Sequence, residues 1–309
     1  MEYLSPKLDI VFKKMFGDKN NSDMLRSLVG AYLNIDTSGK FELLNTEITP
    51  EELERKFARL DLRISTETSE IDVEVQVLNA PDYRERSIYY WASLYASSVK
   101  RGEEYSTART TMALNILDFK MLDCANYNTN FTFYDEENKI RLSNKAQISF
   151  IELPKIRTYT KEQIATDERI AWAAFFNSKR EEDFNMLNQV TTNPNVQKAV
   201  TIIRELSSDE KIREEARKRE EALFTERSAL SSTYDKGVSD GIAKGIAKGM
   251  AKGMAKGMEK GRAEGMAKGM EKGRAEGRAE LAAELAANLR AMGMSEEQIK
   301  IALNGQSLS

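Results

Sequence analysis

The sequence contains no histidine and only one cysteine among its 309 residues. Without histidine, the chain cannot build a Ser-His-Asp or Cys-His nucleophile system, a histidine-ligated zinc site or a histidine general base. The single Cys124 excludes an intramolecular disulfide and a thiolate zinc cluster, and it fits a reducing compartment. Any hydrolytic chemistry of this chain therefore has to use carboxylates, lysine, tyrosine, glutamine or a cation that prefers oxygen ligands.

Long apolar runs and a strong charge of one sign are also missing. No stretch approaches the about 18 consecutive apolar residues of a transmembrane helix, and the first residues, MEYLSPKLDIVF, lack the basic-then-apolar order of a signal peptide. We therefore expect a soluble, cytoplasmic protein with no membrane partner. Because the formal net charge is only −3, any site for DNA or another polyanion has to be a local patch.

The apolar residues that are present suffice for a folded core, since 41% of the chain is hydrophobic and 8% is aromatic. Helical periodicity predicts helices at 6–16 (with Ser5 as N-cap), 22–33, 84–101 and through most of 160–233. Alternation predicts strands at 41–47, 59–65, 71–77, 111–117, 131–135 and 147–153. This order of elements describes an α/β or α+β core with a helical annex.

The C-terminal part of the chain is a repeat with glycine at every fourth position from Gly237 to Gly277. Each interior glycine costs a helix about 0.8–1 kcal/mol relative to alanine, so the eleven glycines oppose roughly 10 kcal/mol of helix stability. Two interpretations are open: a marginal helix or extended spacer that a partner chain orders, and a low-complexity tract without a specific role. We divide the chain into a core (1–158), a helical annex (159–233), a repeat spacer (234–280) and a helical hairpin (281–309).

The C-terminal hairpin is too small to bury much apolar surface by itself. We therefore expect it to dock on another surface, most simply that of a second copy, which predicts a homo-oligomer formed through the C-terminal tail. A helix-turn-helix that enters DNA is the alternative interpretation, although the two helices carry few basic residues.

The segment IDVEVQV, residues 71–77, alternates strictly between apolar and polar residues. If the preceding predicted strand pairs with it as an antiparallel hairpin, Asp61 lies opposite or diagonal to Glu74, about 5–8 Å away. Two carboxylates that close repel each other unless Arg63 or a divalent cation lies between them, and Mg²⁺ prefers such oxygen ligands. A solvated sheet face explains the same alternation, so the spacing alone leaves both interpretations open.

Several segments, in order, resemble one protein family. They are SPKLDIVFKKMFGD, RLDLRISTETSEIDVEVQV, PDYRERSIYYWASLYASSVKRGEEY and ALNILDF, followed by the Gly-x-x-x repeat that ends in AMGMSEEQIK. Together they resemble the Rpn family of recombination-promoting nucleases, also described as transposases, within the PD-(D/E)XK nuclease superfamily. The resemblance covers most of residues 5–155. It implies an α/β fold with a PD-(D/E)XK nuclease-like core, in which helices flank a central mixed sheet.

The resemblance also implies an activity and its central residues. The activity is that of a metal-dependent DNA endonuclease linked to recombination or mobile elements, with Mg²⁺ or Mn²⁺ as cofactor and DNA as partner. Asp61 matches the first acid of the family motif and Glu74 the second, so both are expected to bind the metal ion. Gln76 stands where the motif has its lysine, and we count it with Asp61 and Glu74 as catalytic.

Four further residues are expected to contact the substrate, namely Asp9, Arg63, Arg86 and Tyr90. Asp9 matches an acid that commonly lies near such sites, and the helix 84–101 brings Arg86 and Tyr90 towards them, where an arginine can contact a phosphate. Three of these residues also have a purely structural interpretation. Asp9 also fits the stabilisation of first-turn amides of a helix, Arg86 also fits a surface ion pair, and Tyr90 also fits the core.

Gln76 is the one departure from the family pattern. Glutamine can hydrogen-bond to a water, but it supplies neither a basic group nor a positive charge. The resemblance then implies a water activated by the metal ion as the nucleophile, with Lys56 or Arg63 supplying the missing charge. The alternative function is a catalytically weak or inactive DNA-binding or regulatory protein that oligomerises through its C-terminal repeat tail.

Overall fold

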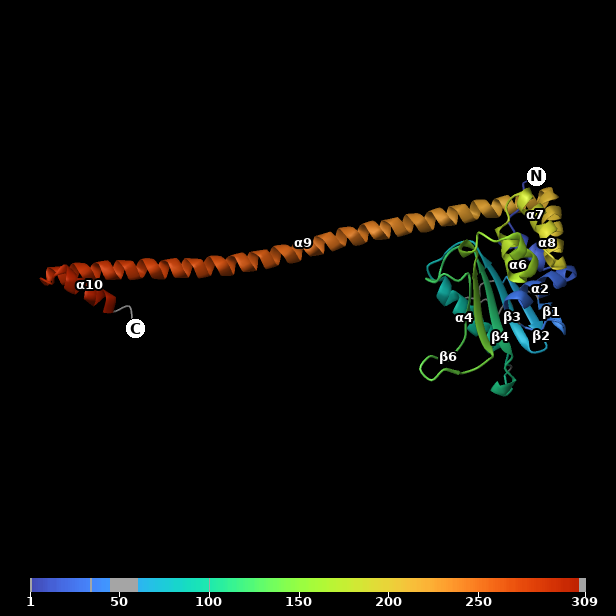
Figure 1. Cartoon of the computed structure of the whole chain (residues 1–309), viewed down its shortest axis with the longest axis horizontal. Coiled ribbons are helices and arrows are strands. Elements are labelled where there is room, and N and C mark those ends of the chain that lie inside the picture. Colours follow the sequence, from blue (N-terminus) through green and yellow to red (C-terminus); the bar gives the residue numbers. More distant parts are fainter. Residues whose placement is uncertain (1, 34, 45–60, 100, 306–309) are drawn as a thin grey trace. The chain divides into compact units, whose positions relative to one another are not determined.

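The first part of the chain folds around a mixed β-sheet with helices packed against it (Figure 1). The computed structural model describes residues 2–33, 35–44, 61–99 and 101–305. The chain divides into two units, Met1–Ala229 and Leu230–Ser309. Within the described residues, no helix combines the length and the apolar character that crossing a membrane requires.

Six of the described strands form one sheet. Across the sheet their order is β1 (Phe41–Leu44), β2 (Leu62–Thr66), β3 (Ser69–Gln76), β4 (Thr110–Leu117), β8 (Ala146–Glu152) and β5 (Asn128–Phe131). β2 and β3 form the predicted antiparallel hairpin, while β3, β4 and β8 run parallel. The edge strands β1 and β5 run antiparallel to their neighbours. Two short strands, β6 (Tyr134–Asp135) and β7 (Ile140–Arg141), pair separately.

Among the described residues, helices precede the sheet, α4 (Tyr83–Ser97) lies between two of its strands, and further helices follow it. They are α1 (Asp9–Phe16), α2 (Ser22–Leu33), α4 (Tyr83–Ser97), α5 (Lys161–Thr166), α6 (Glu168–Asn177), α7 (Glu181–Val190), α8 (Pro194–Ser208), α9 (Glu210–Ala291) and α10 (Glu296–Gly305), with short 3₁₀ turns at Lys19–Asn21, Tyr105–Thr107 and Leu153–Lys155. This arrangement confirms the predicted α/β fold class, in which helices flank a central mixed sheet.

One apolar core joins the sheet to the helices on one of its faces. The apolar side chains of β3, such as Val73, belong to the same buried cluster as Phe12 of α1, Phe175 of α6, Phe184 of α7 and Ile203 of α8. Apolar residues of the predicted annex 159–233 therefore belong to the same buried cluster as the sheet.

The opposite face of β3 is covered by α4. Trp91 of α4 donates from Nε1 to the carbonyl oxygen of Thr111 (2.9 Å), and Tyr83 donates from Oη to Oδ1 of Asn115 (2.8 Å). Both bonds attach α4 to β4. As a result Glu74, on the polar face of β3, is only 3% exposed. The interpretation of the alternating segment as a solvated sheet face is therefore wrong.

Some predicted ends differ from the structure. The first helix begins at Asp9, not after Ser5 as N-cap, because the carbonyl of Ser5 accepts from the amide of Leu8 (3.1 Å) in a preceding turn. The predicted strand 131–135 is wrong, since β5 ends with its last pairing to β8 and the chain starts a new strand at Tyr134. The predicted strands 41–47 and 59–65 extend partly outside the described residues.

The glycine repeat lies within α9, which is one continuous helix. A Cβ added at any of the repeat glycines from Gly237 to Gly277 would meet nothing within 4 Å in the described structure. The helix ends before Gly293, whose φ of +87° suits glycine. Ser295 and Gln298 then exchange the two bonds of a capping box (3.0 and 3.5 Å) at the start of α10. What the repeat does stays a prediction.

Candidate active site

Asp61 and Glu74 meet where β2 begins and β3 ends. Leu62 pairs with Val73 in the hairpin, so one step further Asp61 lies opposite Glu74. The Asp61 amide donates to Oε1 of Glu74 (3.0 Å), and the Val75 amide donates to Oδ2 of Asp61 (3.0 Å). Asp61 is 6% exposed and Glu74 3%. The sheet register thus holds two buried carboxylates side by side.

A chain of hydrogen bonds leads from Glu74 to α4. Gln76 donates from Nε2 to Oε2 of Glu74 (3.1 Å), and Arg86 donates from Nη2 to Oε1 of Gln76 (3.2 Å). The Arg86 guanidinium lies 4.8 Å from the ring centre of Tyr83 and 6.0 Å from that of Tyr90. Two aromatic rings and one amide therefore fix the arginine, and the arginine in turn fixes the amide of Gln76.

Lys13 of α1 brings a positive charge to the acidic pair. Its Nζ lies 2.8 Å from Oδ1 of Asp61. The sequence had pointed to Lys56 or Arg63 as the source of this charge, but Lys56 lies outside the described residues and Arg63 contacts other groups. Lys13 was not predicted as a site residue.

A cavity of about 320 Å³ opens onto these groups. Its wall includes six of the predicted site residues, Asp9, Asp61, Glu74, Gln76, Arg86 and Tyr90. It also includes Lys7, Lys13, Arg219, Leu223 and Glu226. The structure thus brings together residues from the first helix, the hairpin, α4 and the first turns of α9.

Burial dominates the electrostatics of the acidic pair. It raises the pKa of Glu74 to about 8, and the neighbouring Asp61 carboxylate adds to the rise. Burial also raises the pKa of Asp61, although Lys13 opposes this by favouring the charged form. The pKa of Asp72, which is buried under α4, lies well above its ordinary range because of desolvation and the Glu74 charge. In the described structure, Asp61 has a direct cationic partner in Lys13, and Glu74 has none.

This donor set fits a hard divalent cation. Asp61 and Glu74 offer only oxygen atoms, and a cation between them would relieve the repulsion that raises the pKa of Glu74. In the described ranges, no group of three or more aspartate, glutamate, histidine or cysteine side chains is arranged to hold a metal ion. Mg²⁺ commonly takes one or two protein carboxylates and completes its shell with water and phosphate oxygens, so two acids suffice for that type of binding.

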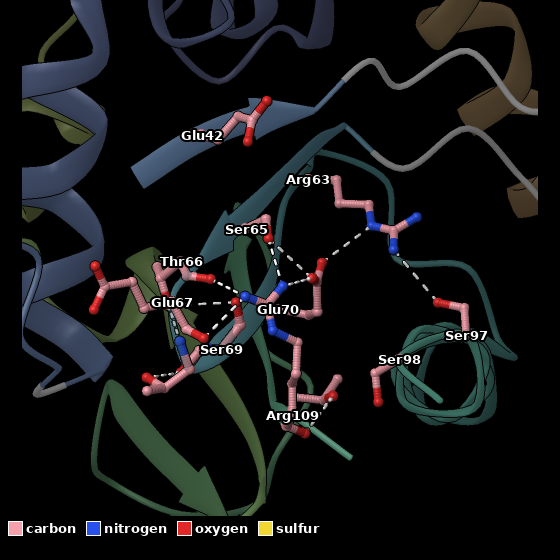
Figure 2. A network of polar contacts seen from close by, with 12 residues as sticks. Glu42, Arg63, Ser65, Thr66, Glu67, Ser69, Glu70, Ser97, Ser98 and Arg109 are labelled. Atoms are coloured by element: carbon pink, nitrogen blue, oxygen red, sulfur yellow. Dashed lines mark hydrogen bonds and ion pairs between the residues drawn. The ribbon is translucent and has the colours of Figure 1, made fainter. Parts of the chain in front are cut away.

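Arg63 lies outside the cavity, in a second polar network (Figure 2). Its Nε is 3.5 Å from Oε2 of Glu70, and its Nη2 donates to Oγ of Ser97 on α4 (3.4 Å). Arg109, which directly precedes β4, contacts the same carboxylate. Its Nη1 lies 2.5 Å from Oε1 of Glu70 and 2.7 Å from Oγ of Ser65. This network ties the hairpin turn to α4 and so stabilises the register that sets Asp61 opposite Glu74. It gives no support to a substrate contact by Arg63.

The sequence contained a usable signal for one of the missed residues. Asp9 and Lys13 are four positions apart in the first helix, so they share a face, while Val11 and Phe12 point into the core. The prediction that Asp9 lies near the site therefore also indicated Lys13, its neighbour on the same face of the helix. Arg219 carried no such signal, because it stands among many charges in the segment EEARKREE.

Comparison with known proteins agrees with this geometry. The family model described as PD-(D/E)XK nuclease family transposase matches residues 6–233, which include every group that lines the cavity. Neither the curated proteins nor the solved structures give a match. Since the match covers well over half of the chain, the protein belongs to the PD-(D/E)XK nuclease family of transposases.

Proposed function

We propose that this protein is a metal-dependent DNA endonuclease that hydrolyses phosphodiester bonds in recombination or mobile-element processes. The observation that carries the proposal is the buried pair Asp61 and Glu74, which opens onto a cavity that also contains Lys13 and Arg86. Buried acids that are only partly neutralised are unfavourable for stability, so their presence in a cavity favours a function in binding a cation.

Asp61 and Glu74 would hold Mg²⁺ or Mn²⁺. When bound, the ion supplies positive charge that stabilises the transition state and lowers the pKa of water. Hydrolysis forms a bond between a water oxygen and phosphorus, breaks the bond from phosphorus to the leaving sugar oxygen, and leaves that oxygen protonated. The proton lost by the attacking water passes to solvent.

The chain's own residues position the reactants. Gln76 holds Glu74 in place by its amide and can hydrogen-bond to the attacking water. Lys13 supplies the ammonium that the family motif places at the position of Gln76, and it does so from α1. Arg86, held against Tyr83 and Tyr90, is oriented to contact a phosphate oxygen.

The test is the nicking of supercoiled plasmid by purified protein with Mg²⁺, with Mn²⁺ and with EDTA. We expect cleavage with either metal ion, none with EDTA, and none from Asp61→Ala or Glu74→Gln proteins whose circular dichroism matches the wild type. Cleavage at the wild-type rate by either variant, or undiminished cleavage in EDTA, would refute the assignment.

A second candidate function is favoured by the exposed apolar side chains of the repeat. Ile242 is 59% and Met254 75% exposed on α9, which is unusual for a chain without a partner. Together with Gln76, this favours a catalytically weak DNA-binding or regulatory protein that forms a homo-oligomer through its tail. Full biological activity of Asp61→Ala, with loss on deleting residues 237–309, would support it. If light scattering gives the same number of chains per particle with and without the tail, an oligomer formed through the tail is excluded.

A further inference from the structure

The first turns of α9 form part of the wall of the active-site cavity. Arg219, Leu223 and Glu226 all line it, and their spacing of four and three residues places them on one face of the helix. These residues belong to the first unit, Met1–Ala229. Ala216 on the same helix is 1% exposed in the core cluster and Leu223 packs against that cluster, so apolar contacts already hold this part of α9 in place.

Arg219 uses only part of its hydrogen-bonding capacity. Its Nε donates to both carboxylate oxygens of Asp9, at 3.0 and 2.9 Å. Its two terminal nitrogens, Nη1 and Nη2, make no hydrogen bond or ion pair with the residues that the structure describes. By contrast, Arg217 two positions earlier uses both terminal nitrogens on Glu214 and Glu221 of its own helix.

The other cations of the cavity wall already have partners. The ammonium of Lys7 is 2.8 Å from Asp118, and that of Lys13 is 2.8 Å from Asp61. Arg86 donates from Nη2 to Gln76 and is enclosed by Tyr83 and Tyr90, and its buried Nε has no hydrogen-bond partner in the described structure. Arg219, which lines the cavity, keeps four N–H donors of its planar fork without a partner in the described structure, and such a fork matches the geometry of two phosphate oxygens.

A purely structural role for Arg219 leaves this arrangement unexplained. The same two helices are joined by a second ion pair, Lys14 to Glu215 (3.1 Å), which does not line the cavity. Both pairs are partly exposed, with Arg219 at 36% and Lys14 at 37%, so each contributes little to stability. The two pairs differ in that Asp9 and Arg219 line the cavity, whereas Lys14 and Glu215 do not.

We propose that Arg219 is a substrate-positioning residue, which binds a backbone phosphate of the DNA through Nη1 and Nη2 while Asp9 holds its Nε. The inference rests on the proposed function, because it presumes a DNA substrate in this cavity. It assigns to α9, outside the sheet and its hairpin, a direct part in holding the substrate.

The experiment measures binding of a short fluorescent duplex DNA to the full-length protein in EDTA, so that no cleavage occurs, over a series of salt concentrations. Arg219→Gln and Lys14→Gln each remove one positive charge from an ion pair between α1 and α9. We expect Arg219→Gln to weaken binding about tenfold and to lower the slope of log K against log salt by about 0.9. Lys14→Gln is expected to change the dissociation constant less than about threefold.

Asp9→Asn and Glu215→Gln complete the design by removing the acid from each pair. Asp9→Asn leaves the guanidinium in the cavity and removes a negative charge that repels phosphate, so we expect binding to tighten about threefold at low salt. Glu215→Gln serves as its control outside the cavity. Opposite effects of Arg219→Gln and Asp9→Asn cannot come from loss of the ion pair alone, since both variants break the same pair.

Three outcomes would overturn the inference. Equal weakening by Arg219→Gln and Asp9→Asn would show that the pair is only structural, and equal behaviour of Arg219→Gln and Lys14→Gln would show that only net charge matters. In both cases the proposed nuclease function stands. Wild-type protein that binds no duplex at any salt concentration would instead refute the DNA substrate, and the inference with it. Thermal unfolding of each variant checks that all are folded.

Discussion

In the metal-free protein, Glu74 should make stability depend on pH in a direction opposite to that of an ordinary glutamate. Its pKa is raised from 4.5 to about 8 in the folded protein. Between these values the folded state keeps the proton that the unfolded state has lost. Stability from this group is therefore fully present below pH 4.5 and is lost as pH rises towards 8.

The size of the effect follows from the same values. Each pH unit between 5 and 7 lowers the free energy of unfolding by about 1.4 kcal/mol through this one group, or about 3 kcal/mol in all. Glu74→Gln cannot ionise, yet it keeps an oxygen that can accept from the Asp61 amide. We therefore expect the variant to lack this loss and to become the more stable protein as pH rises.

The assay is urea unfolding in EDTA at several pH values, followed by tryptophan fluorescence. Trp91 and Trp172 both lie in the first unit, so the signal reports the unfolding of that unit. At each pH we compare the free energy of unfolding of wild type with that of Glu74→Gln. Contributions from other groups largely cancel in this difference, and a constant effect of the substitution does not change its slope against pH.

Parallel pH profiles of the two proteins would refute this reasoning, since they would show that Glu74 ionises normally in the folded state. A second arm uses Mg²⁺. If Mg²⁺ binds Glu74 as proposed, it has to displace the proton, so added Mg²⁺ should stabilise the wild type more at pH 8 than at pH 6. It should stabilise Glu74→Gln far less at either pH.

Three other substitutions test separate parts of the structure. Lys13→Gln should slow plasmid nicking about 100-fold through loss of transition-state charge, whereas Lys14→Gln should not; equal rates for the two variants would exclude Lys13 from the chemistry. Arg109→Gln should lower the free energy of unfolding by about 3 kcal/mol in urea, because Glu70 is left buried with a poor partner; a change below 0.5 kcal/mol would contradict the role of that network. Gly253→Ala should stabilise the helix by about 0.8–1 kcal/mol in thermal circular dichroism, since an added Cβ meets nothing within 4 Å. Loss of an oligomer in light scattering would instead place that glycine in an interface.

The fold was predictable where local pattern and pairing agree. The strict alternation of 71–77 and the short connection before it predicted the β2–β3 hairpin, which the register confirms. The same pattern could not decide whether the polar face meets water or protein. That depends on α4, whose Trp91 and Tyr83 form hydrogen bonds to β4 residues 20 and 32 positions away in sequence. Such contacts leave no periodic pattern in the sequence of the strand.

The candidate site was predictable to the extent that its members share an element or a register. Asp61, Glu74 and Gln76 follow from the hairpin, and the structure places them in one cavity with Arg86. Arg63 was placed there by the same argument, but its long side chain turns towards Glu70, where a buried charge offers a stronger interaction. Arg219 lies in α9, which begins more than 130 residues after the end of β3. Nothing in its local sequence distinguishes it from the charged residues around it.

The distribution of charge in the cavity explains how glutamine can occupy the position of the motif lysine. Asp61 has its own cation, Lys13, delivered by α1, and Asp9 has Arg219, delivered by α9. Glu74 is left with the neutral amide of Gln76 and one main-chain amide. A lysine at position 76 would favour the charged form of Glu74, whereas the neutral glutamine leaves its pKa raised to about 8. Glu74 is therefore a carboxylate without a direct cationic partner in the described structure, which fits the proposed binding of a divalent cation.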